Sequence, residues 1–130
     1  PKFSMIMKIN SFTVSLTVEN VSLSSQFLIT HFGFVEKMAA EGFASLQHEQ
    51  SGINVIYLQK GIEVLPAFMR NITSAGTILA FVTTRIEREE ERLRSAGVPI
   101  ALPMKTEEWG EKLFMVKDPN GVIIQLVEWV

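Results

Sequence analysis

The sequence predicts an α+β fold in which two consecutive βαβββ modules form curved mixed sheets around a cleft, with the helices outside. Two observations support this fold class. In each half of the 130-residue chain, a strand pattern is followed by a helix pattern and then by three short strand patterns. The glycines that end the two helices, Gly33 and Gly97, lie about half a chain length apart, as expected for a duplicated module.

The hairpin at residues 109–130 contains the strongest turn signal, the tetrapeptide DPNG. Its proline, Pro119, favours the second position of a type I turn, and Gly121 supplies the positive φ that closes a bulged loop. Residues 113–116 and 122–127 are therefore predicted to pair as strands. Because these strands are apolar on both faces, we expect helices to cover one side of the sheet and a sheltered surface to form on the other.

The first module begins with a strand at residues 12–18, where apolar residues alternate with serine and threonine. Asn20 is typical of a helix N-cap, and Gly33 is typical of the residue that follows a helix. A helix is therefore expected from Asn20 to about residue 32. Three short strands complete the module, at residues 34–39, 43–47 and 53–59.

The second module follows residues 61–75, which contain glycine and proline and are interpreted as a connection. A strand is predicted at residues 77–83. The sequence TRIE at residues 84–87 has the form of a capping box, so that a helix should begin there and end at Gly97. Residues 98–103 are predicted to form an edge strand interrupted by proline.

The second helix carries the charged run REEERLR at residues 88–94. This run is most simply a solvated face on which Glu90 and Arg94 form a weak i,i+4 ion pair. A partner-binding role for the run is the less favoured alternative.

Length and composition indicate a single domain over residues 1–130, with module one at about residues 9–60, the connection at about 61–75 and module two at about 76–130. Hydrophobic residues make up 47% of the chain, which is enough for a core without disulfides or metal, and cysteine is absent. The net charge of −2 does not suggest a nucleic-acid-binding surface, and no apolar run approaches the roughly 20 residues needed to span a membrane, so that neither is expected as a partner. A soluble, cytoplasmic protein is expected.

Three stretches together carry a family resemblance: VSLTVENVSLSSQFLITHFGF, LAFVTTRIEREEERLRSAGV and EEWGEKLFMVKDPNGVIIQLVEW. In order and spacing they resemble the vicinal oxygen chelate superfamily, which groups glyoxalases, bleomycin resistance proteins and extradiol dioxygenases. The resemblance spans nearly the whole chain and implies the glyoxalase/bleomycin-resistance-like fold. It does not fix a function, because one scaffold of this kind hosts several chemistries.

Catalytic members of this superfamily hold a metal with His, Glu or Gln side chains on the cleft faces of four strands. The matching positions in this chain are Thr13, Tyr57, Ile78 and Gln125. Only Gln125 is a plausible ligand, and one carbonyl oxygen cannot replace the three or four protein ligands that such ions require. The resemblance therefore implies neither a bound metal nor another cofactor here.

The two histidines fall outside that set. His31 is expected near the carbonyl groups at a helix end, and His48 is expected at the edge of a hairpin. The residues expected in the helix-covered core are Leu16, Phe27, Leu79 and Phe81.

Trp109 is the leading candidate for ligand binding. The same Trp-Gly step precedes the final hairpin in antibiotic-binding relatives, where it resembles part of a wall on which flat ligands stack. Glu107, Glu108 and Glu111 surround it and would suit a cationic aromatic ligand. The alternative is a hydrophobic plug at the end of the sheet.

Other candidates surround the same predicted cleft. Gln125 lies in an otherwise apolar strand, so that its amide needs a polar partner or a ligand. Tyr57 is either a packed core ring or a cleft residue whose hydroxyl binds a ligand. Phe43 and Phe68 are candidates for completing an apolar cavity, and Phe114 is a third unless strand alternation turns it to the helix side.

Together these features predict a metal-independent small-molecule-binding protein that sequesters a planar or cationic antibiotic-like compound. Two alternatives remain open: a glyoxalase-like lyase or dioxygenase with a divergent metal site, and a non-catalytic interaction module whose cleft is filled by its own side chains. We expect a two-fold homodimer, because the superfamily commonly builds its clefts from paired modules and two-fold dimers are the usual small oligomer.

Overall fold

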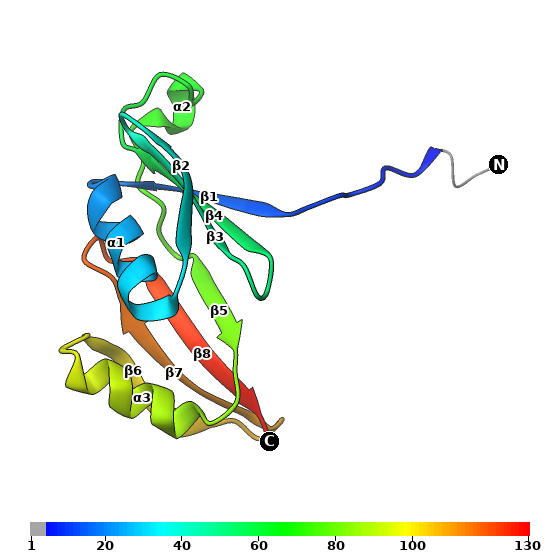
Figure 1. Cartoon of the computed structure of the whole chain (residues 1–130), viewed down its shortest axis with the longest axis vertical. Helices are drawn as coiled ribbons and strands as arrows, with labels where there is room; N and C mark the ends of the chain where they lie inside the picture. The colour runs from blue at the N-terminus through cyan, green and yellow to red at the C-terminus, as the bar shows by residue number, and fades with distance from the viewer. Residues whose placement is uncertain (1–4) are drawn as a thin grey trace.

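The computed structural model describes residues 5–130, where the chain forms eight strands and three helices (Figure 1). Residues 1–4, which the single-domain prediction includes, lie outside the described residues. Within residues 5–130, no helix is long and apolar enough to cross a membrane.

The first module forms a four-stranded mixed sheet with one helix. Its elements are β1 (Thr13–Val18), α1 (Val21–Phe32), β2 (Val35–Ala40), β3 (Phe43–His48) and β4 (Ile53–Gln59). The strand order is β1-β4-β3-β2, with β1 parallel to β4 and the remaining pairs antiparallel.

The second module repeats this arrangement. Its elements are β5 (Ile78–Val82), α3 (Ile86–Ser95), β6 (Ile100–Thr106), β7 (Glu111–Lys117) and β8 (Ile123–Trp129). The order is β5-β8-β7-β6, with β5 parallel to β8. The predicted fold class, a duplicated βαβββ module, is confirmed. The predicted connection also contains a short helix, α2 (Ala67–Arg70), that the sequence analysis did not expect.

Local signals at the first helix are confirmed. The Asn20 side chain accepts a hydrogen bond of 3.1 Å from the backbone N–H of Leu23, and Gly33 adopts the left-handed conformation with φ of 70°.

The capping box predicted at residues 84–87 is wrong. Arg85 is the N-cap of α3, adopts φ of 56°, and caps the helix with no side-chain hydrogen bond. The carboxylate of Glu128 in β8 accepts bonds of 3.3 and 3.1 Å from the N–H groups of Arg85 and Ile86 instead. A long-range acceptor therefore replaces the local one, and it satisfies N–H groups that have no partner within the helix.

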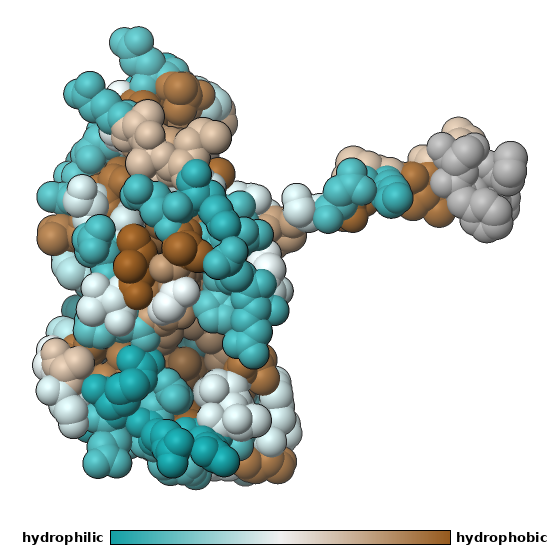
Figure 2. Space-filling view, viewed as in Figure 1, coloured by the Kyte–Doolittle hydropathy of each residue, from teal (hydrophilic) through white to brown (hydrophobic). Residues whose placement is uncertain are grey.

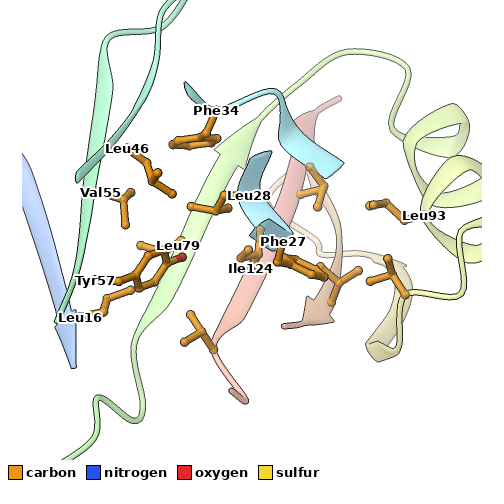
Figure 3. Close-up of a cluster of buried hydrophobic side chains, with 14 of the residues drawn as sticks. Leu16, Phe27, Leu28, Phe34, Leu46, Val55, Tyr57, Leu79, Leu93 and Ile124 are labelled. Carbon is orange, nitrogen blue, oxygen red and sulfur yellow. The ribbon is translucent and has the colours of Figure 1, made fainter. Parts of the chain in front are cut away.

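One hydrophobic cluster joins the two modules (Figure 3). Leu16, Phe27 and Leu79 are buried in it, as the sequence predicts, and Phe81 packs against it while half-buried. The edge strand predicted at residues 98–103 is displaced, because β6 begins at Ile100 and ends at Thr106.

A buried polar contact also connects the modules at the DPNG turn. The Asp118 carboxylate accepts hydrogen bonds from the N–H groups of Asn120 and Val122, at 2.8 and 2.9 Å. Its other oxygen accepts a bond of 2.5 Å from the hydroxyl of Ser24 in α1. The Asn120 amide donates to the carbonyl of Asn20 at 2.6 Å and to the Ser24 hydroxyl at 2.7 Å. The turn of one module is thereby bonded to the first turn of the helix in the other.

Residues 5–12 form an arm that extends away from the body of the protein (Figures 1 and 2). Its large apolar side chains are between 69% and 88% exposed: Met5, Ile6, Met7, Ile9 and Phe12. Such a run of exposed apolar residues is unusual on a monomer and typical of an interaction surface.

Candidate functional site

The four positions at which the family resemblance implies metal ligands do not form a donor set. Thr13 is exposed in β1, and Ile78 is 49% exposed in β5. Tyr57 is buried in the hydrophobic cluster, and the Gln125 side chain is engaged by a carboxylate. Among residues 5–130, no group of three or more His, Asp or Glu side chains is placed to hold a metal ion. These residues therefore do not fit a metal.

Tyr57 lies on the helix-covered face of its sheet and is 0% exposed (Figure 3). Its ring packs with the core, and its buried hydroxyl has no hydrogen-bond partner among the described residues. Burial raises the pKa of this phenol strongly, and the nearby Asp118 carboxylate raises the pKa further, so that the hydroxyl remains neutral. Of the two interpretations of Tyr57, this position matches the packed core ring.

Trp109 and Gln125 are brought together by Glu111. The two oxygens of this carboxylate accept hydrogen bonds from the Trp109 indole N–H at 3.2 Å and from the Gln125 amide at 3.1 Å. Gln125 therefore has the polar partner that its burial requires. Trp109 itself is 67% exposed. Gly110 beside it has φ of 90°, and a Cβ there would lie 2.7 Å from the Val130 carbonyl oxygen.

The carboxylates around Trp109 are mostly engaged. Glu107 forms an ion pair of 2.6 Å with Lys105, and Glu111 holds Trp109 and Gln125. Lys105 offsets one of the three negative charges beside Trp109, and the bonds of Glu111 organise the loop itself.

The phenylalanines proposed to complete this cleft are dispersed. Phe68 is 80% exposed on α2, and Phe43 lines a small polar hollow beside α1 and β2. Phe114 is 0% exposed in the helix-covered core, which is the orientation that strand alternation allows. The structure therefore does not gather them around Trp109.

A hollow lies where the two modules meet, and we call it the intermodular groove. It has a volume of about 770 Å³ and is lined by the end of α1, the β3–β4 turn, β5 and one side of α3. None of six predicted site residues lines it: Thr13, Phe43, Tyr57, Phe68, Trp109 and Gln125. Ile78 lines a neighbouring hollow of about 530 Å³ at the base of the arm.

Three phenyl rings form the apolar wall of the groove. Phe32 and Phe81 meet edge to face with ring centroids 5.4 Å apart, and Phe34 lies 5.8 Å from Phe81. These rings come from both modules, because Phe81 is in β5 while Phe32 and Phe34 flank Gly33 at the end of α1. Flat ligands are bound well by walls of this kind.

Polar and charged side chains lie beside these rings in the groove. Arg92 of α3 lies with its guanidinium carbon 6.0 Å from the centroid of the Phe32 ring and pairs with Glu89 at 2.8 Å. The His48 ring nitrogen Nδ1 lies 2.8 Å from the Ser51 hydroxyl. Burial lowers the pKa of His31, and the positive charge of Arg92 lowers it further, so that both favour the neutral form of His31.

Sequence reasoning missed this groove. It assigned Phe81 to the core, the helix with Arg92 to a solvated face, His31 to the surface and His48 to the edge of a hairpin. The available signal was the sequence HFGF at residues 31–34, which places three aromatic side chains around a helix-ending glycine. That signal shows a cluster of rings but does not show which strand of the other module faces it.

A family model described as the "Glyoxalase/Bleomycin resistance protein/Dioxygenase superfamily" matches residues 8–126. No curated protein matches the sequence.

Solved structures share the fold at low sequence identity. A glyoxalase/bleomycin resistance protein/dioxygenase from Nocardioides superposes with a TM-score of 0.76 at 18% identity, over 99% of this chain and 90% of the other. TioX from Micromonospora sp. ML1 gives 0.69 at 18% identity, over 94% and 100%. Lactoylglutathione lyase from Agrobacterium tumefaciens gives 0.73 at 11% identity, over 94% and 96%. Identities this low establish a common fold and carry no substrate.

Proposed function

The chain belongs to the glyoxalase/bleomycin resistance protein/dioxygenase superfamily, and we propose that it binds a planar small molecule in the intermodular groove without a metal. The observation that carries this proposal is the wall of three phenyl rings in a hollow of about 770 Å³. Small-molecule sites are commonly hollows of this size, lined by apolar side chains with a few polar groups that fix orientation.

The polar groups of the groove support binding more than catalysis. The imidazole of His48 is bonded to Ser51, and the guanidinium of Arg92 pairs with Glu89. The Ser51 hydroxyl does lie within hydrogen-bond reach of an imidazole, but His48 Nδ1 also accepts from the Ser51 N–H and Ser51 Oγ from the Ile53 N–H, which are local bonds of the β3–β4 turn. Sequestration of an antibiotic-like compound is the simplest function for such a site. The three phenyl rings support the planar shape of that compound.

The enzyme alternative, a glyoxalase-like lyase or dioxygenase, requires a metal held by other residues. Elemental analysis of protein purified without chelator separates the two. We expect no stoichiometric zinc, nickel, manganese or iron. One equivalent of any of these, lost together with an activity, would favour the enzyme.

The binding site is tested by filling the groove. Ala80 is an exposed residue of β5 that lines both the groove and the neighbouring hollow of about 530 Å³, so that Ala80→Trp should place an indole at the edge that they share. We expect at least a tenfold loss of affinity, on the order of 1.4 kcal/mol. The measurement is isothermal titration calorimetry with three matched planar probes: 2-naphthoate, 2-naphthamide and 2-naphthylmethylammonium.

Ala101→Trp is the matched control. Ala101 is also an exposed alanine of an edge strand, at the second position of β6, and it does not line the groove. We expect this variant to bind like the wild type. Equal loss in both variants, or no effect of Ala80→Trp, would place the ligand elsewhere. Binding of none of the probes would remove the support for an aromatic site.

The two-fold homodimer expected from the sequence remains a proposal, and the arm supports it. Burying each large apolar side chain of residues 5–12 against a second copy would contribute about 1.5–3 kcal/mol. Reciprocal contacts of this kind close into a two-fold dimer. Sedimentation equilibrium at micromolar concentration should give about twice the chain mass of 14.6 kDa.

Replacing Ile6 and Ile9 together with serine should shift the protein towards that single-chain mass. Phe68→Ser is the control, since Phe68 is 80% exposed but lies outside the arm. A wild type that sediments at the mass of one chain would contradict the dimer. A dimer that survives the Ile6/Ile9 replacement unchanged would show that the arm does not hold it.

A further inference from the structure

We infer that the ligand of the intermodular groove is a planar aromatic anion, whose ring lies on the phenyl wall and whose acidic group lies beside Arg92. This inference rests on the proposed function and adds the charge of the ligand. It departs from the cationic ligand that the acidic loop around Trp109 suggested.

The first argument is the contiguity of the cation and the rings. The Arg92 guanidinium carbon lies 6.0 Å from the centroid of the Phe32 ring, and the centroid of that ring lies 5.4 Å from the centroid of the Phe81 ring. A flat molecule with an acidic substituent would therefore meet the cation and the rings within one groove. A guanidinium group also binds a carboxylate through two parallel N–H bonds, which fixes the plane of the ligand.

The second argument is that Arg92 retains donors for a ligand. Glu89 is its partner on the same helix, and the Arg92 Nε and Nη2 atoms lie 3.1 and 2.8 Å from one oxygen, Oε1. A guanidinium carries five N–H donors, and most of them are therefore not bonded to Glu89. The Arg92 side chain is 42% exposed, and an exposed i,i+3 pair of this kind is weak enough for a ligand carboxylate to compete with Glu89.

The third argument is the charge that the groove presents. His31 lies in the same groove, and the positive charge of Arg92 contributes to lowering its pKa. The field of Arg92 therefore reaches the groove, but the Glu89 carboxylate also lines it, so that an anion is favoured locally, at the guanidinium where it competes with Glu89. Titratable side chains line the groove from three elements: His31 of α1, His48 of β3, and Glu89 and Arg92 of α3.

The experiment compares the three matched probes by isothermal titration calorimetry on the full chain. We expect 2-naphthoate to bind at least tenfold more tightly than 2-naphthamide, and 2-naphthylmethylammonium to bind most weakly. Arg92→Gln should weaken 2-naphthoate about tenfold and leave 2-naphthamide within about twofold, because it removes one charge-assisted contact. Glu89→Gln should strengthen 2-naphthoate about threefold, because it removes the competing carboxylate.

The adjacent ion pair provides matched controls. Arg94 and Glu90 form a pair of 3.4 Å on the same helix and do not line the groove. Arg94→Gln and Glu90→Gln make the same changes of net charge as the groove variants and should leave all three affinities unchanged. If Arg94→Gln weakens 2-naphthoate as much as Arg92→Gln does, the effect is one of net charge and the inference fails.

The remaining outcomes separate this inference from the proposed function. Binding of 2-naphthamide or 2-naphthylmethylammonium as tightly as 2-naphthoate, with loss in Ala80→Trp, would overturn the anionic ligand and retain the groove as the site. If no probe binds, the proposed site and the inference fail together.

Discussion

Replacing Asp118 with alanine is expected to lower the free energy of unfolding by about 3 kcal/mol. The carboxylate is 4% exposed and accepts three hydrogen bonds, from the Asn120 and Val122 N–H groups and from the Ser24 hydroxyl. Alanine leaves these donors without an acceptor, and water reaches such a site poorly. Urea denaturation followed by far-UV circular dichroism measures the change.

Two further variants separate the turn from the contact between modules. Asp118→Asn keeps a side-chain acceptor for the turn and should cost less than Asp118→Ala. Ser24→Ala removes only the bond to α1 and should cost about 1 kcal/mol. A loss below about 1 kcal/mol in Asp118→Ala would show that water replaces the carboxylate and that the contact contributes little.

This contact links stability to the groove. Ser24 is in the first half of α1, and the end of the same helix carries His31 and Phe32. The groove wall is shared between modules, so that a change in how α1 sits on the turn moves Phe32 relative to Phe81. We therefore expect the position of the rings to depend on Asp118, although Asp118 does not line the groove.

The fold was predictable because its signals are local. Asn20 caps α1 three residues ahead of its donor, Gly33 ends the same helix, and Gly121 closes the final hairpin with φ of 87°. The Asp118–Ser24 bond spans 94 positions, and nothing in the DPNG sequence indicates that partner. The turn formed by DPNG could be predicted from the sequence, and the contact of that turn with the other module could not.

The candidate site was predicted less well than the fold. Strand alternation leaves Gln125 in need of a polar partner, and Glu111 of the same hairpin supplies one. The groove draws its walls from α1, β5 and α3, whose packing is a tertiary property. Phe81 belongs at once to the core and to the groove wall, and periodicity alone assigns it only to the core.

Replacing Glu128 with alanine is expected to lower the free energy of unfolding by about 2 kcal/mol, near the upper end of the effect of losing a helix cap. The carboxylate accepts from the N–H groups of Arg85 and Ile86, and Ile86 is 0% exposed. Its negative charge also lies at the positive end of the α3 dipole. Chemical denaturation gives the stability, and hydrogen exchange at the first turn of α3 gives the local effect.

Glu128→Gln and Glu91→Ala complete this experiment. Glutamine keeps an acceptor and loses the charge, so that it should cost about 1 kcal/mol. Glu91 is exposed in the middle of α3, and its side chain has no hydrogen bond to the N-terminal turn, so that Glu91→Ala should change stability by less than about 0.5 kcal/mol.

Arg92 is on the helix that Glu128 caps, and faster exchange in Glu128→Ala should therefore accompany weaker 2-naphthoate binding. Unchanged exchange at Ile86 in Glu128→Ala would show that solvent caps the helix equally well and that the long-range cap has no structural role.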